Sequence, residues 1–440
     1  MLFLTFGLTE MEVKMDSLSF FLGLLRLEKR DYALLKLLLS PSNDEEEIAA
    51  FFQSIDIDTE DHDRICLIAQ LGLQNNYQGV PKSEIPRLRG VTRHTVIRNT
   101  QLIMNAIELM KEYQSQGIPV LLCKGIALRL GYLKHQSRHM WDIDLLIPYE
   151  ACGPAEEIAE KAGYEITHSR HALNLRKKAD HNIQIDVHHV FIKTNIKFQS
   201  QVESVVWERA KKINAHGVTV CLPSAEDLAL QILTNEFSNL VMESNQKSHF
   251  KWIYDLSCVL GSTGSFDWNL LFTMARGYKV DGIVRIMLLL LNQVAPSMID
   301  LQTVRGAFPD ESSDQKLVSY YKNNIISFQK YAKARKTKKM GRYIWHWLPY
   351  TWAVHRYYLY GLSGWEILKR FPENLRIVFG VNSWAEFPLA AINKIKLRRK
   401  RDRDEACSES RGINGADKNS EYTGDTAAAG PLFPKGENQF

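Results

Sequence analysis

Two aspartates at alternate positions mark the stretch of the sequence that is best suited to chemistry. Residues 141–147 read WDIDLLI. Because side chains alternate along a strand, we expect Asp142 and Asp144 to share one face while the apolar residues between them face a core. Two carboxylates at that spacing lie roughly 7 Å apart at their Cα atoms. Converging side chains there can share Mg²⁺ ions, which need hard oxygen ligands.

A third carboxylate, Asp186, stands in the same kind of pattern further along the chain. Residues 183–188 read IQIDVH, so that the apolar residues share one face while Gln184, Asp186 and His188 share the other. If this strand lies beside the first, Asp186 joins the two aspartates. Two metal ions about 4 Å apart could then clamp the attacking and leaving oxygens of an in-line displacement. Phosphoryl-type transfer needs mainly such positioning and neutralisation of charge.

The turn that precedes the first aspartate has the residues of a phosphate cradle. A short apolar run at 120–123 suits a buried strand, and Lys124-Gly125 then turns the chain into a short helix. Gly125 permits close approach of the backbone, and the helix start offers free N–H groups. Lys124 and Arg138 could neutralise phosphate charge. The residues expected to bind the nucleotide are therefore Lys124, Gly125, Arg138 and His188.

Helices and strands must both contribute to positioning these residues. Helical periodicity covers residues 16–90 and, more strongly, 92–116, where Gly117 ends the helix. Strands are expected around 120–123, 142–147, 164–167, 172–176 and 183–190, with a helix at 155–162. Beyond about residue 220 the pattern is helical again, and Ser224 can cap a helix start. This order predicts an α+β fold, in which a small mixed sheet is flanked by N-terminal and C-terminal helical regions.

The chain divides into five segments by pattern and composition. The expected segments are an N-terminal helical region (1–91), the core (92–215), a helical domain (216–330), a basic and aromatic helical extension (331–393), and a basic run with a tail (394–440). The basic run reads KIKLRRKRDR over residues 394–403. From about residue 404 the composition is that of a disordered tail.

The overall composition is that of an ordinary globular protein. Of the 440 residues, 45% are hydrophobic and 24% are charged, which argues against a repeat array, a collagen or a wholly disordered chain. The net charge of +5 is compatible with a nucleotide or a nucleic acid, but much of it lies near the C-terminus. The six cysteines include no CxxC pair, and no apolar run reaches the about 20 residues of a membrane span. With an N-terminus unlike a signal peptide, these features predict reduced thiols and a cytoplasmic protein.

Taken in order, the motifs resemble those of a known family. The matching residues are Leu121-Leu122-Cys123-Lys124-Gly125, Arg138, Asp142-Ile143-Asp144-Leu145-Leu146, Gly163-Tyr164 and Asp186-Val187-His188. The chain resembles the polymerase-beta-type nucleotidyltransferases and, more narrowly, a bacterial family of uncharacterised nucleotidyltransferases, over roughly residues 20–300. The resemblance implies a nucleotidyltransferase core that moves an NMP group from an NTP, with ATP expected, and releases pyrophosphate. The acceptor is left open between a small molecule, a sugar, a protein side chain and an RNA end.

The resemblance also implies roles for the three aspartates. Asp142, Asp144 and Asp186 would be the catalytic residues and would bind Mg²⁺ or Mn²⁺, with Asp186 helping to take the proton of the acceptor hydroxyl. The wider superfamily has Gly-Ser or Gly-Gly at the turn and a shorter gap to the aspartates. This chain has Lys-Gly and a longer gap.

Simpler interpretations of the single residues stay open. Lys124 and Gly125 could be only turn residues. Arg138 could pair structurally with an aspartate, and His188 could be a polar residue at the rim of the sheet.

Two other functions also stay open. A catalytically silent nucleotide-binding or assembly protein could keep this fold, although the presence of all three carboxylates argues against it. A nucleic-acid-binding protein could use the basic and aromatic residues of 333–370 and the run 394–403. A helix packed through its aromatic residues is the simpler account of 333–370. Capping or surface salt bridges would explain Asp227 and Asp255.

Overall fold

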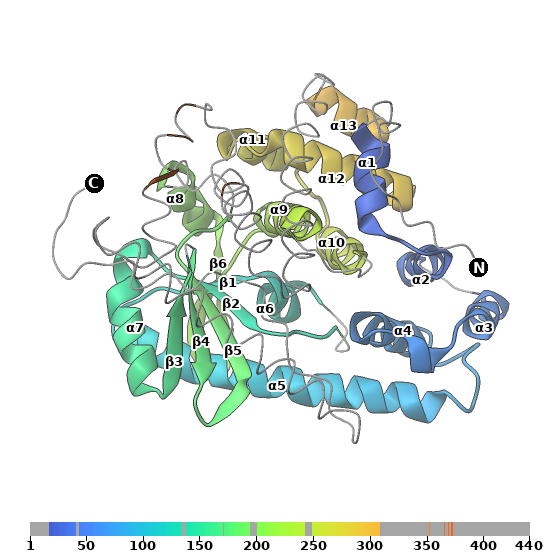
Figure 1. Cartoon of the computed structure of the whole chain (residues 1–440), viewed down its shortest axis with the longest axis horizontal. Helices are drawn as coiled ribbons and strands as arrows, with labels where there is room; N and C mark the ends of the chain where they lie inside the picture. Colours follow the sequence, from blue (N-terminus) through green and yellow to red (C-terminus); the bar gives the residue numbers. More distant parts are fainter. Residues whose placement is uncertain are drawn as a thin grey trace, which may run out of the picture.

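A long helix and a seven-stranded sheet form the frame of the molecule (Figure 1). This computed structural model describes residues 17–308 except 41–43, 134–137, 170, 194–199 and 243–248, together with five isolated positions between 352 and 372. Apart from those five positions, the expected basic and aromatic extension, the run 394–403 and the tail lie outside the described residues. Among the helices of the described residues, none combines the length and apolar character needed to cross a bilayer.

The sheet is mixed, and its strands lie in the order β3-β4-β5-β2-β1-β7-β6. The strands are β1 (Leu121–Cys123), β2 (Ile143–Leu146), β3 (Tyr164–His168), β4 (Ala172–Lys177), β5 (Asp180–His188), β6 (Lys211–Ala215) and β7 (Val218–Leu222). The pairs β2–β5 and β1–β7 are parallel, and the other neighbouring pairs are antiparallel. The first five strands confirm the prediction. The sequence pattern does not predict β6 and β7, because β6 is an exposed edge strand whose start is charged.

Four helices precede the long helix, as the periodicity of the N-terminal region predicts. They are α1 (Ser17–Leu25), α2 (Lys29–Leu39), α3 (Glu45–Ser54) and α4 (His62–Gln74). Aspartates cap two of them: Asp44 accepts a hydrogen bond from the Glu46 N–H in α3, and Asp61 accepts one from the Arg64 N–H in α4. Helix α4 packs between α2 and the long helix α5, so its apolar stripe is buried.

The long helix α5 (Ile85–Ser115) runs along the lower edge of the view in Figure 1 and packs on β2, β5 and β7. It begins at Ile85 and not at 92 as predicted, because Pro86 suits the first turn of a helix. Its buried residues follow helical spacing, among them Leu102, Ala106, Leu109 and Tyr113. Gly117, in the left-handed region with a φ of 73°, follows its end.

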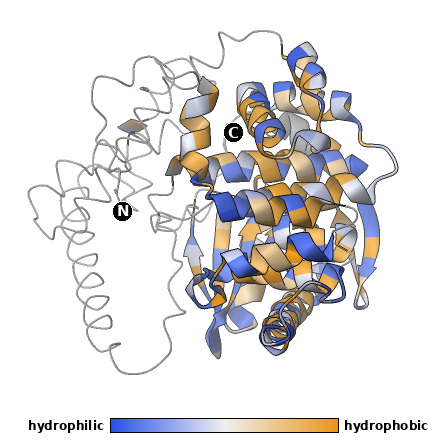
Figure 2. Ribbon diagram, turned by 90° about the vertical axis from the view of Figure 1, so that its right-hand side faces the viewer, coloured by the Kyte–Doolittle hydropathy of each residue, from blue (hydrophilic) through white to orange (hydrophobic). Residues whose placement is uncertain are grey.

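The remaining helices cover the sheet and form the C-terminal helical region. They are α6 (Lys124–Ala127), which continues as a π-helical turn over Leu128–Tyr132, α7 (Cys152–Lys161), α8 (Ser200–Arg209), α9 (Ala225–Met242), α10 (Lys251–Ser262), α11 (Trp268–Gly277), α12 (Asp281–Val294) and α13 (Leu301–Ala307). As predicted, Ser224 caps a helix, since its Oγ accepts a hydrogen bond from the Asp227 N–H at 3.1 Å in α9. Helix α12 is buried on every side over residues 282–291, so it forms the centre of this helical region. Figure 2 shows hydrophobic and hydrophilic residues interspersed along the helices that face the viewer.

One continuous core of buried apolar side chains extends from Phe21 to Phe308. It joins the N-terminal helices, the sheet and the later helices, and α1 accordingly contacts α9 and α12. The five described cysteines are free. The reduced state stays a prediction. These observations confirm the predicted α+β class with flanking helical regions. The division into five segments stays a prediction.

Candidate active site

Two neighbouring parallel strands bring the predicted carboxylates together. Strand β2 pairs with β5 so that Asp144 lies opposite Asp186 and Leu146 lies opposite His188. Asp142 comes directly before β2, in a bend outside the strand. Its charge contributes to the raised pKa of Asp186, so its carboxylate lies near the other two. On the other side the apolar residues are fully buried, as the alternation predicts: Ile143, Leu145, Ile185 and Val187.

Asp144 lies at the centre of the site and is only 4% exposed. Its Oδ1 accepts a hydrogen bond from Nζ of Lys124 and another from Nε2 of His188, the latter at 2.8 Å. Lys124 reaches it because β1 pairs with β2 in a register that sets Cys123 opposite Asp144. Burial lowers the pKa of His188 to about 4, so the neutral ring presents its single N–H to the carboxylate. His188 therefore orients Asp144.

The three carboxylates repel one another in a confined space. Burial, and next the charge of Asp144, raises the pKa of Asp142. Burial, and next the charges of Asp142 and Asp144, raises the pKa of Asp186 to about 7. Burial would also raise the pKa of Asp144, but the charge of Lys124 and the hydrogen bond from His188 hold it well below its usual range. Negative charge gathered in this way favours the binding of a cation.

The donor atoms of the site also suit a small divalent cation. One oxygen of Asp144, one oxygen of Asp186 and a ring nitrogen of His188 lie within 4.8 Å of one another. Carboxylate oxygens are the ligands that Mg²⁺ and Mn²⁺ prefer. The oxygen ligands in this group come from Asp144 and Asp186, and Asp142 lies outside it. A role of Asp142 as a metal ligand stays a prediction.

Arg138 forms a buried ion pair with Asp255 of α10. The guanidinium donates to both carboxylate oxygens, at distances of 2.8 and 2.7 Å. Structural pairing with an aspartate is thus what the structure shows, and a role of Arg138 at a triphosphate stays a prediction. A Cβ at Gly125 would lie 2.9 Å from Nη1 of Arg138, so glycine at this position allows the arginine to approach.

The two later aspartates are buried, so the expectation of surface salt bridges is wrong. Asp255 is 5% exposed and Asp227 is fully buried. Asp227 accepts a hydrogen bond from Nε of Arg209 at 2.9 Å and another from the Ser224 hydroxyl at the start of α9. Both aspartates are held by an arginine from a distant part of the chain, which local sequence does not reveal.

The family of the chain follows from its match to a family model. The model described as uncharacterised nucleotidyltransferase matches residues 64–296, more than half of the 440 residues. The chain belongs to this nucleotidyltransferase family. The resemblance seen in the motifs is thereby confirmed. No curated protein sequence matches the chain.

Three solved structures, of two proteins, show a distant similarity to part of this chain. An antigenic nucleotidyltransferase-like protein from Paracoccidioides brasiliensis is 15% identical, with 48% of this chain and 97% of that chain covered and a TM-score of 0.35. The antibiotic-resistance factor ANT(2'')-Ia in solution is 14% identical, with 45% and 95% covered and a TM-score of 0.28. ANT(2'')-Ia in complex with adenylyl-2''-tobramycin is 15% identical, with 41% and 97% covered and a TM-score of 0.29. Likeness at this level says nothing about the acceptor of the present nucleotidyltransferase.

Gln231 of α9 fixes the Lys124 turn of this nucleotidyltransferase, and the motifs do not point to it. Lys124 has a φ of 46°, in the left-handed region that is unfavourable for a residue with a side chain. Its N–H donates to Oε1 of Gln231 at 2.8 Å, and Nε2 of Gln231 donates to the Phe191 carbonyl at 3.2 Å. A signal is present in the sequence: Asp227, Gln231 and Thr234 recur at helical spacing in α9, and all three polar side chains are buried.

Lys193, which follows β5, is a second lysine of the candidate active site that the motifs do not reveal. Burial, and next the charge of Lys124, lowers its pKa to about 8, while Asp144 and Asp186 oppose this shift. Beside the carboxylates, a small cavity is lined by Lys124, His188, Phe191, Ile192, Lys193, Gln231, Thr234 and Asn235. Two cations and several hydrogen-bonding groups therefore converge there, which suits phosphate oxygens.

Proposed function

We propose that this chain is a metal-dependent nucleotidyltransferase that moves an NMP group from an NTP, with ATP the first choice, to an acceptor and releases pyrophosphate. The observation that supports this most directly is the parallel register that sets Asp144 of β2 opposite Asp186 of β5. Membership of the nucleotidyltransferase family supports the general activity. The acceptor would be a small molecule, a sugar, a protein side chain or an RNA end.

The three aspartates would hold the metal ions, Mg²⁺ or Mn²⁺. Their mutual repulsion, seen in the raised pKa values of Asp142 and Asp186, is the property of this site that fits a cation. When bound, the ions would neutralise phosphate charge and lower the energy of the developing negative charge. His188 would keep Asp144 in place through its 2.8 Å hydrogen bond.

The protein would position the two substrates with its own side chains. Lys124 and Lys193 line the cavity beside the carboxylates and would contact the phosphate oxygens. Gly125 would let the phosphates approach the backbone, and Gln231 would keep the Lys124 turn in its left-handed form. Asp186 is the carboxylate that would accept the proton of the acceptor hydroxyl. Arg138 would reach a phosphate only by leaving Asp255.

Transfer of label from each NTP in cell lysate, with Mg²⁺ or Mn²⁺, tests this function. The variant is Asp144→Asn, and the matched control is Asp180→Asn, an exposed aspartate at the start of β5. We expect wild type and the control to label an acceptor. The rate of labelling by Asp144→Asn should be lower by about 10³-fold or more, as when a group that stabilises transition-state charge is removed. Equal labelling by Asp144→Asn would refute the site. Binding of NTP without any labelling by wild type would favour the silent binding protein.

A further inference from the structure

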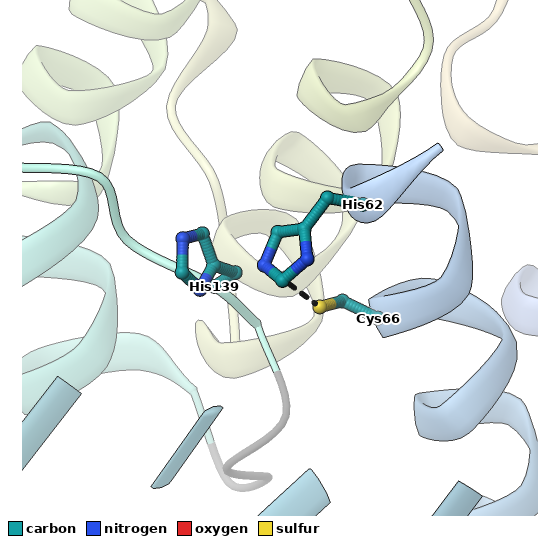
Figure 3. Close-up of side chains that lie close together, drawn as sticks. All are labelled: His62, Cys66 and His139. Atoms are coloured by element: carbon teal, nitrogen blue, oxygen red, sulfur yellow. Dashed lines mark hydrogen bonds between the residues drawn. The ribbon is translucent and has the colours of Figure 1, made fainter. Parts of the chain in front are cut away.

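A second cluster of metal-binding side chains lies between α4 and the segment that leads into β2 (Figure 3). His62 and Cys66 are one helical turn apart on α4 and therefore share a face of the helix. His139 meets them from the other segment, and the donor atoms of the three residues all lie within 4.8 Å of one another. The cluster contains none of the residues of the candidate active site.

His139 is buried without hydrogen bonds, which is unusual for an imidazole. The residue is 4% exposed, and neither ring nitrogen has a hydrogen-bond partner among the described residues. A buried polar group without a hydrogen bond is destabilising, so such a group in a native structure needs an explanation. Its ring stands edge-on to that of His62, with centroids 4.2 Å apart. A metal ion between the side chains would satisfy one of the His139 nitrogens.

The spacing of the donor atoms is already close to that of a tetrahedral site. The Cys66 Sγ and the His62 Nε2 are 3.8 Å apart. Bond lengths of about 2.3 Å to sulfur and about 2.0 Å to nitrogen, at a tetrahedral angle, place the two ligand atoms roughly 3.6 Å apart. In Figure 3 the His62 ring lies between His139 and the sulfur of Cys66. The His62 ring would turn out of this space when the three donor atoms surround one ion.

The surroundings hold the three residues in place. The side chain of Asn99 in α5 donates to the Arg138 carbonyl at 2.8 Å and accepts from the Met140 N–H at 3.1 Å, which fixes the backbone on both sides of His139. The Thr95 hydroxyl lies 3.6 Å from the Cys66 sulfur, where it could donate to a thiolate. Trp141 packs against both histidine rings, with centroids 5.3 and 4.6 Å away.

We propose that His62, Cys66 and His139 form a binding site for a divalent transition metal, Zn²⁺ above all. Two imidazoles and a thiolate select a borderline-soft ion such as Zn²⁺ or Co²⁺ over Mg²⁺, which the oxygen ligands of the aspartates would select. On binding, the Cys66 S–H bond breaks, a sulfur–metal bond forms, and the proton passes to solvent. Water would occupy the fourth position of the ion.

The site would join the N-terminal helices to the catalytic segment. His62 and Cys66 belong to α4, whereas His139 lies three residues before Asp142. A bound ion would therefore connect two elements far apart in the sequence at a point next to the carboxylates. The inference does not depend on nucleotidyl transfer, because metal binding is measured without substrate.

Titration of the full-length, chelator-treated protein with Co²⁺ tests the proposal. Thiolate–Co²⁺ charge-transfer absorption reports Cys66 as a ligand, and quenching of Trp141 fluorescence, isolated by comparison with Trp141→Phe, reports the ion beside that ring. We expect one Co²⁺ per chain with this absorption, displaced by one Zn²⁺ and not by Mg²⁺. Cys66→Ser and His139→Gln should each weaken Zn²⁺ binding by at least about 100-fold. This loss is larger than the loss expected from replacing a residue that only hydrogen-bonds to a metal ligand.

Matched substitutions separate a lost ligand from a damaged fold. Cys221→Ser on β7 and His181→Gln, which is exposed on β5, should keep full binding. Far-ultraviolet circular dichroism shows which variants are folded. A folded wild type that lacks charge-transfer absorption would overturn the proposal. So would a Cys66→Ser variant that binds Zn²⁺ as tightly as wild type.

Discussion

Among single residues, Arg138 and Asp255 show that a charged side chain next to the candidate active site can have a structural role. Their side chains are 11% and 8% exposed, and the two charges meet through two hydrogen bonds. The pair connects the segment before β2 with α10. Removal of one partner leaves the other charge buried and uncompensated, which is more costly than the loss of a surface pair.

Arg138→Ala and Asp255→Ala should each lower the free energy of unfolding by about 3–5 kcal/mol. The double variant should lose clearly less than the sum, because it leaves no unpaired charge. Urea unfolding of the four proteins measures this coupling. If the double variant loses the sum of the two single losses in unfolding free energy, the ion pair contributes little to stability. Arg138 would then be available to bind a phosphate.

The sequence predicts those site residues whose direction follows from the alternation of side chains along a strand. Asp142, Asp144 and Asp186 could be found because each lies between apolar residues that must face the core. Gln231 and Lys193 could not be placed, since their proximity to Lys124 depends on how α9 and the end of β5 pack. His139 was equally hidden, because its partners His62 and Cys66 lie on a helix far upstream.

Among the elements, the turn between β1 and α6 is the most constrained. Lys124 is left-handed, Gly125 follows it, and the side chains of Arg138 and Met140 pack against Gly125. The long helix α5 offers a contrast, because Gly90 is exposed within it and a Cβ there would meet nothing within 4 Å.

Gly125→Ala should destabilise the protein by about 1–3 kcal/mol, since the added Cβ must displace a guanidinium that Asp255 holds. Gly90→Ala should instead stabilise it by about 0.5–1 kcal/mol, because alanine favours a helix interior. Thermal unfolding of both variants beside wild type measures the two shifts. If both substitutions shift the unfolding temperature in the same direction and by the same amount, the packing at Gly125 is not tight.

The elements that the sequence predicts best are those with a buried face of regular spacing, such as the C-terminal part of α5 and strands β2 and β5. The edge strand β6 is not predicted from the sequence, because its residues are KKINA and only one of them is buried. The sequence predicts the two strands but not their pairing, and the parallel pairing of β2 with β5 is known from the structure. It depends on the crossover through α7, β3 and β4, which local pattern does not specify.

On the scale of the whole molecule, ion pairs between distant segments join the N-terminal helices to the C-terminal ones. Lys251 of α10 donates to Asp63 of α4 at 2.9 Å, and the two residues are 188 positions apart. Burial would raise the pKa of Asp63, but the charge of Lys251 lowers it to about 2 from the usual 3.8. The folded protein therefore holds this carboxylate ionised at a pH where the unfolded chain protonates it.

The stability that this pair contributes should be present above about pH 4 and lost as the pH falls towards about 2. Asp63→Asn should cost on the order of 1–2 kcal/mol near pH 6, and its difference from wild type should shrink below about pH 4. Urea unfolding at several pH values, with a chelator present, follows this difference. A difference that stays constant or grows on acidification would exclude the pair as its source.

The parallel pairing of β1 with β7 has a consequence for synthesis of the chain. Strand β1 pairs with β2 on one side and β7 on the other, and β7 begins only at Val218. At translation rates of about 5–20 residues per second, a nascent chain waits roughly 5–20 seconds between the emergence of β1 and that of β7. During this interval the apolar Leu121–Cys123 edge has no strand to cover it, and such an edge is open to pairing with other chains. The ribosome-bound intermediate is therefore expected to be more open to pairing with other chains than the finished protein.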